Sequence, residues 1–225
     1  MIRASDFIYR WSDLHDEEFE IEIVIDSLYM QIVSQEKTWQ EIQDKFNQMV
    51  ENDAKLNSMQ ESQGDYYRHQ YLHQEQSNTE MRRMQRYSML TSIFNFVESR
   101  LGVLCEKIEA DNNFTKKLKN MAGDGYVDKK WNYLCEVYNI DSTDTQPFID
   151  SLQKYRGFRN AITHSGGYID KFKRDALLPN TTVGITIEEG DRLYYIDITD
   201  VEFLKNLLRA CSGILFAKQD IIVAS

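Results

Sequence analysis

The residues with the clearest chemical potential are Arg159, Asn160 and His164, which lie within the run YRGFRNAITHSGG. A histidine accepts and donates protons near neutral pH. An arginine carries a permanent charge and a planar fork of donors that matches a phosphate group. The asparagine adds an amide that can orient a phosphate or fix the histidine from one helical turn away. Together these side chains supply the groups that are needed to cleave RNA.

RNA cleavage of this kind needs no metal ion or cofactor, because the 2′-hydroxyl of RNA is itself the nucleophile. A base must remove the 2′ proton, a cation must stabilise the crowded phosphorane, and an acid must protonate the leaving 5′ oxygen. We expect His164 to be the base or the acid and Arg159 to hold the non-bridging oxygens. The expected products are a 2′,3′-cyclic phosphate and a 5′-hydroxyl.

The run RNAITH resembles the Arg-x4-6-His motif of the HEPN superfamily, in which Asn, Asp or His usually follows the arginine. The resemblance covers about residues 80–217 and implies a mainly all-α, up-and-down helical bundle. It further implies a homodimer with a composite active site, and an endoribonuclease of the toxin or anti-phage defence kind with a possible antitoxin or regulatory protein. In some relatives an acid on the central helix contacts the motif arginine, and Glu98 is the matching candidate here.

Three other interpretations remain open. A HEPN dimer can lack catalysis and bind a nucleotide or a partner protein such as a nucleotidyltransferase. The chain can also be a helical scaffold. In the third interpretation, His164 only stabilises the C-terminal end of a helix, and Arg159 only pairs with Glu98 or another acid inside the bundle.

The charge of the chain is unevenly distributed. The net charge of −10 argues against a general nucleic-acid coat protein. From residue 153 to residue 174, however, one acid accompanies six basic residues, so this segment carries +5 and the rest −15. We expect Arg156, Lys171 and Lys173 to bind RNA phosphates next to the motif, with strongly salt-dependent affinity.

Composition bounds the class of protein. The 225 residues, with 42% hydrophobic and 12% aromatic residues, predict one folded domain or one domain plus an extension. The three cysteines, Cys105, Cys135 and Cys211, are widely spaced and form no CxxC pair. This pattern, with no apolar signal core or membrane-spanning run, predicts reduced thiols in a cytoplasmic protein. Phosphate-binding loops, GxGxxG fingerprints and HExxH motifs are absent from the sequence.

Apolar residues at alternating steps of three and four predict the helices that must position the motif. One such seam runs from Ile21 to Met49, although residues 19–25 also alternate like a strand, and we expect it to pack within the chain. A second runs from Tyr87 to Ile108 and predicts a helix over about 80–110. We divide the chain into an N-terminal helical extension, residues 1–80, packed on a HEPN-like domain, residues 81–225.

The motif itself is expected at the end of a helix over about 147–164, stopped by Gly166 and Gly167. On this helix Arg159 lies at the edge of the apolar arc, where a buried charge is costly without a partner. Two short helices are expected over 113–139, and a β-hairpin over about 182–199. A last helix follows, capped by Thr199 or Asp200.

Overall fold

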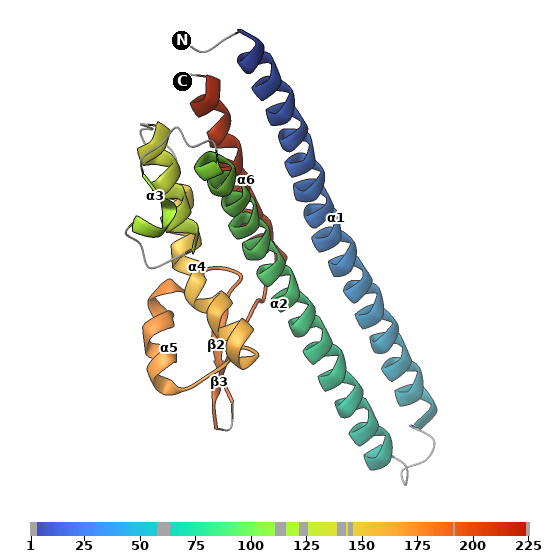
Figure 1. Cartoon of the computed structure of the whole chain (residues 1–225). Helices are drawn as coiled ribbons and strands as arrows, with labels where there is room; N and C mark the ends of the chain where they lie inside the picture. The colour runs from blue at the N-terminus through green and yellow to red at the C-terminus, as the bar shows by residue number, and fades with distance from the viewer. Residues whose placement is uncertain are drawn as a thin grey trace.

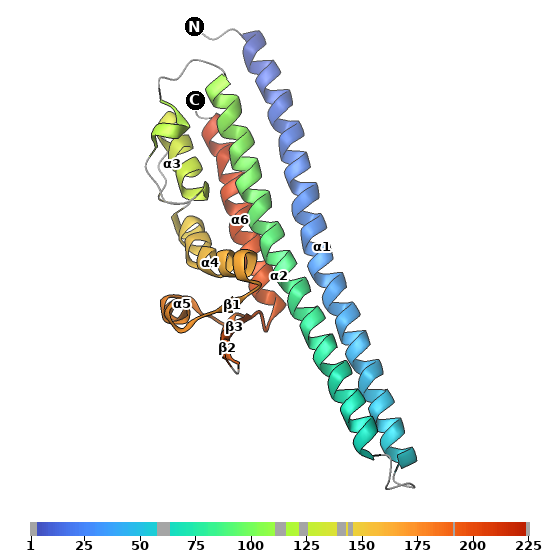
Figure 2. The same ribbon diagram turned by 60° about the horizontal axis from the view of Figure 1, so that its bottom comes forward.

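The computed structural model describes the backbone of residues 4–57, 64–110, 116–121, 126–138, 143, 146–190 and 192–223. Helices α1 (Ala4–Asn57) and α2 (Gly64–Ala110) form a long antiparallel pair (Figures 1 and 2). The ends of the two helices that are joined to each other project beyond the other elements, and both chain termini lie toward the opposite end. Among the described residues, no helix is both long enough and apolar enough to span a membrane.

Most of the apolar seam of α1 packs within the chain, as the sequence predicts, although Met49 at its end is exposed. Ile21, Ile32 and Phe46 are buried, and residues 19–25 are helical, which excludes the alternative of a strand there. The helix expected over about 80–110 is longer than predicted, because α2 already begins at Gly64. The division between residues 80 and 81 therefore falls within a continuous helix.

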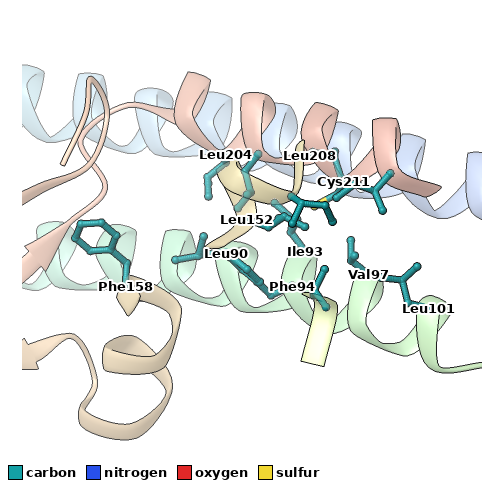
Figure 3. Packing of buried hydrophobic residues seen from close by; sticks show 14 of the residues in the cluster. Leu90, Ile93, Phe94, Val97, Leu101, Leu152, Phe158, Leu204, Leu208 and Cys211 are labelled. Atoms are coloured by element: carbon teal, nitrogen blue, oxygen red, sulfur yellow. The ribbon is translucent and has the colours of Figure 1, made fainter. Parts of the chain in front are cut away.

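The central helix α2 packs against α3 (Tyr126–Tyr138), α4 (Gln146–Ser165) and α6 (Val201–Val223). Figure 3 shows where the apolar residues of α2, α4 and α6 meet. The α2 residues predicted from the second seam are buried there, together with residues of the other two helices: Leu90, Phe94, Val97, Leu101, Leu152, Phe158, Leu204, Leu208 and Cys211. The mainly helical class is thus confirmed.

Short elements precede and follow these helices. Of the two helices expected over 113–139, the second is α3, while the first is only a 3₁₀ turn over Leu118–Asn120 within the described residues. The last helix, α6, begins after Asp200, whose Oδ1 accepts a hydrogen bond from the backbone N–H of Glu202 at 2.9 Å. Asp200 is therefore the capping residue.

The predicted β-hairpin is present but belongs to a larger sheet. Strands β2 (Thr186–Glu189) and β3 (Tyr194–Asp197) pair antiparallel, and β1 (Tyr168–Ile169) pairs with the other edge of β3, giving the order β1-β3-β2. The sequence predicted a two-stranded hairpin, whereas the structure has a three-stranded sheet. Two residues are too short to carry an alternating pattern, so β1 leaves no periodic signal in the sequence.

A further helix, α5 (Lys171–Leu177), follows β1 directly and was not expected from the sequence. The side chain of Asp170 caps it by accepting a hydrogen bond from the backbone N–H of Lys173 at 2.8 Å. The helix has only seven residues, which is too few for a clear apolar seam. A 3₁₀ turn over Leu178–Asn180 then leads toward β2.

Candidate functional site

Helix α4 presents the motif at its C-terminal end. Its apolar residues face the bundle: Ile149, Leu152, Phe158, Ala161 and Ile162 are buried. The helix ends as predicted, because Gly166 and Gly167 adopt φ of 61° and 82° and donate to the carbonyls of Ile162 and Ala161. These two hydrogen bonds form the Schellman arrangement that glycine favours at a helix end.

The guanidinium of Arg159 reaches α2, where it has two polar partners. Its Nη2 lies 3.0 Å from Asn95 Oδ1 and 3.3 Å from Glu98 Oε2. The side chains of Arg159 and Glu98 are 17% and 21% exposed, so the ion pair lies at the edge of the bundle. The contact with Glu98 that the sequence suggested is present. The partial burial of Arg159 is thus compensated by a carboxylate and an amide.

Asn160 holds the other side of the same guanidinium. Its Oδ1 accepts a hydrogen bond from Arg159 Nη1 at 3.1 Å. Asn160 was expected to orient a phosphate or to fix the histidine. The observed contact is neither of these, because the amide oxygen binds the arginine. Arg159 Nε is buried and has no hydrogen-bond partner among the described residues.

His164 lies in the last turn of α4 and is exposed. Within the described part of the chain, its ring makes no hydrogen bond or ion pair. Five positions separate it from Arg159, which corresponds to roughly 140° around a helix and about 7.5 Å along it. The arginine therefore turns toward α2, whereas the histidine is open to solvent.

The three predicted phosphate-binding residues lie on two neighbouring helices. Arg156 is half-buried on α4, and Lys171 and Lys173 are exposed on α5. Helix α5 contacts α4 through Leu177, which packs so closely on Gly157 that a Cβ there would clash. The structure thus places both lysines on a helix that packs against the motif helix.

Asn95 also belongs to the site, although no pattern in the sequence predicts it. It lies one helical turn before Glu98 and contacts the same nitrogen of Arg159. An exposed asparagine on a helix surface has no distinctive spacing. Only its position three residues before the suspected partner could have drawn attention to it.

Two buried arginines lie on α2 before Asn95 in the sequence. Arg83 and Arg86 are both 8% exposed. Arg86 pairs with Glu36 of α1, with 2.7 Å between Nη2 and Oε1, and donates to the carbonyl of Ile198. Arg83 donates to the hydroxyl of Tyr168 at 2.8 Å and lies against the ring of Tyr195. These contacts tie α1, α2 and the sheet together, which is a structural role.

Comparisons with known proteins do not identify a relative of this chain. No family model matches it, and no curated protein or solved structure is significantly similar to it. The resemblance to the HEPN superfamily accordingly rests on the RNAITH residues of the sequence alone.

Proposed function

We propose that this protein is a HEPN-type, metal-independent endoribonuclease that acts on RNA with Arg159, Asn160 and His164. One observation carries the proposal: a motif arginine is held in place by three polar side chains, and an exposed histidine lies on the last turn of the same helix. Exposed lysines on the adjacent helix α5 add the positive charge that an RNA backbone requires.

The proposed reaction follows from the chemistry of these groups. His164 takes the proton of the 2′-hydroxyl, or donates one to the leaving 5′ oxygen. Arg159 stabilises the charge that develops on the phosphorane oxygens. Asn160 and Asn95 act on Arg159 by limiting the directions in which its guanidinium can point. The reaction ends with a 2′,3′-cyclic phosphate and a 5′-hydroxyl.

We further propose that two copies of the chain form one active site. A single histidine cannot easily act as base and acid in one cleavage event, and a second copy would supply the other. The angle between Arg159 and His164 on α4 favours the same arrangement, since groups from two chains can approach one phosphate from different sides. A homodimer of this kind fits a cytoplasmic toxin or anti-phage defence effector, controlled by an antitoxin or another regulatory protein.

A second candidate function has one specific observation in its favour. Both terminal nitrogens of Arg159 already have partners within the chain: Nη1 contacts Asn160, and Nη2 contacts Asn95 and Glu98. An arginine bound in this way can serve a non-catalytic HEPN dimer that binds a nucleotide or a partner protein such as a nucleotidyltransferase. In that case the wild-type protein would dimerise but would not cleave RNA.

The deciding experiment is incubation of total RNA with the purified protein in excess EDTA, beside the His164→Ala variant. The proposal expects wild-type cleavage to 2′,3′-cyclic phosphate ends and a loss of about 10²–10⁴-fold in the variant. Thr163→Ala, at an exposed neighbouring position, is the matched control and should cleave at nearly the wild-type rate.

Two outcomes would contradict the proposal. Equal cleavage by wild-type protein and His164→Ala would place the activity elsewhere in the chain or in a contaminant. Absence of cleavage by a freshly prepared dimer would favour the non-catalytic module.

A further inference from the structure

The most exposed aromatic side chain among the described residues is Phe172, at 85%. It lies on α5 between two exposed lysines, Lys171 and Lys173. We propose that Phe172 is a base-stacking residue, which binds an unpaired base of a single-stranded RNA next to the cleavage motif. This inference rests on the proposed function, because it names the form of the RNA that the site takes.

The position of α5 relative to α4 is the first argument. Leu177, at the end of α5, packs on Gly157 of α4, and the beginning of α5 is joined to the end of α4 through residues 166–170. The two segments therefore run in opposite directions, so that Phe172 lies toward the end of α4 that carries His164. Figure 1 shows α5 beside the C-terminal half of α4.

The direction of the Phe172 side chain is the second argument. Arg174 lies against the ring of Tyr194 on β3, at 4.4 Å from the ring centroid, and Leu177 is buried on α4. Phe172 is separated from both by roughly 140–160° around the helix. It therefore points away from the two surfaces that hold α5 in place, and its ring is available to a ligand.

The other aromatic residues near the motif are already engaged. Tyr155 packs edge-to-face on Phe203, with ring centroids 4.8 Å apart. The Tyr168 hydroxyl accepts a hydrogen bond from Arg83, whose guanidinium lies 5.2 Å from the centre of the Tyr168 ring. Both tyrosines therefore have partners within the chain. Phe172 has the open aromatic face.

The charge around Phe172 favours RNA over a second copy of the chain as its occupant. Lys171, Lys173 and Arg174 outnumber the neighbouring acids Asp170 and Asp175, so this surface attracts a polyanion. Bases stack on aromatic side chains with little dependence on sequence. In a symmetric contact between two copies, the same patch would face itself and bring four lysines together. A single strand of RNA satisfies the charges and the ring at once.

The test uses the full chain carrying His164→Ala, so that RNA is bound without being cut. Fluorescence anisotropy would measure affinity for an oligouridylate of about twelve nucleotides, a usual site size for single strands, and for a sugar–phosphate strand of the same length without bases. Phe172→Leu should weaken binding of the oligouridylate roughly 5- to 150-fold and leave the abasic strand nearly unchanged. Phe172→Trp should restore the wild-type affinity.

Val183→Ala is the matched control, because Val183 is exposed to 89% but has no aromatic ring; it should bind both strands like the parent protein. An equal loss for both strands, or no loss, in Phe172→Leu would overturn the inference. So would a shift of Phe172→Leu from dimer to monomer in sedimentation, which would assign Phe172 to a contact between copies.

Cleavage assays with His164 intact separate this inference from the proposed function. If wild-type protein and Phe172→Leu cleave RNA equally and bind it equally, base stacking is wrong and the ribonuclease proposal stands. If wild-type protein cleaves nothing but Phe172→Leu loses base-dependent affinity, the catalytic proposal fails and the stacking residue stands as part of an RNA-binding surface. If wild-type protein neither cleaves nor binds RNA, both are wrong.

Discussion

The guanidinium of Arg159 and the carboxylate of Glu98 meet where α4 packs on α2, with 3.3 Å between Nη2 and Oε2. The two residues are 61 positions apart in the sequence. Asn95 contacts the same nitrogen from one turn earlier on α2. The central helix therefore holds the motif arginine in place, and the packing of α2 on α4 determines where that charge lies.

This ion pair should contribute measurably to stability. Both side chains are about four-fifths buried, so we expect a coupling free energy of about 1 kcal/mol, at the upper end of the range for exposed pairs. Urea unfolding of Arg159→Met, Glu98→Gln and the double variant would give this value from a double-mutant cycle. The pair Arg100 and Glu20, whose glutamate is 61% exposed, is the control and should couple more weakly. Strictly additive effects of Arg159→Met and Glu98→Gln would contradict the prediction.

The two glycines that end α4 should respond differently to alanine. Gly166 has φ of 61°, and a Cβ added there would meet no atom within 4 Å, so Gly166→Ala should cost only the backbone penalty, about 1–2 kcal/mol. Gly167 has φ of 82°, and a Cβ there would clash with the ring of Tyr87. Gly167→Ala should therefore cost about 1–3 kcal/mol more than Gly166→Ala. Thermal or urea unfolding of both variants checks this, and equal losses would show that Tyr87 moves aside without cost.

The cysteine thiols should react slowly in the folded protein. Burial raises the pKa of Cys105 to about 12 and that of Cys135 to about 11. At pH 8 the fraction of reactive thiolate is then roughly a thousandfold smaller for Cys105 than for an ordinary thiol. For Cys135 it is roughly a hundredfold smaller. Iodoacetamide labelling followed by mass spectrometry should show slow native reaction that accelerates about tenfold per pH unit, with the urea-unfolded chain as the fast control. Rapid labelling of Cys105 at pH 8 would disprove it.

The contribution of Asp197 to the stability of the protein should decrease as pH rises through the acidic range. Burial raises the pKa of its carboxyl above 3.8, although the nearby Arg86 and Arg83 oppose this shift. Between 3.8 and the raised pKa the folded state binds more protons than the unfolded state, so the contribution of Asp197 to stability decreases as pH rises through this window. The free energy of unfolding of wild-type protein, relative to Asp197→Asn, should decrease accordingly in urea titrations between pH 3.5 and 7. A relative stability that increases with pH would reverse the sign.

Much of the helical framework can be predicted from the sequence. The apolar steps from Ile21 to Met49 and from Tyr87 to Ile108 identify α1 and most of α2, because burial on one side of a helix repeats every three or four residues. Gly166 and Gly167 mark the end of α4. Thr199 or Asp200 marks the beginning of α6, and the structure selects Asp200. The pairing of β2 with β3 follows from the turn between two alternating runs. Each of these signals lies within a short window of the chain.

The sequence also determines which groups could carry out chemistry. It places Arg159, Asn160 and His164 at the end of one helix, and the family resemblance suggests Glu98 as a candidate partner for the arginine. It determines neither the contact with Asn95 nor the pairing of β1 with β3, and it gives no sign that Phe172 is exposed.

Only the tertiary structure decides these last features, because they join residues that no local pattern relates. Arg159 and Asn95, for example, are 64 positions apart, and the contact of Arg83 with Tyr168 of β1 joins residues 85 positions apart. Such contacts depend on how α1, α2, α4 and the sheet pack against one another, since packing fixes which polar groups lose water and must find partners. Local periodicity determines the helices of this protein, and their packing determines the surroundings of its candidate site.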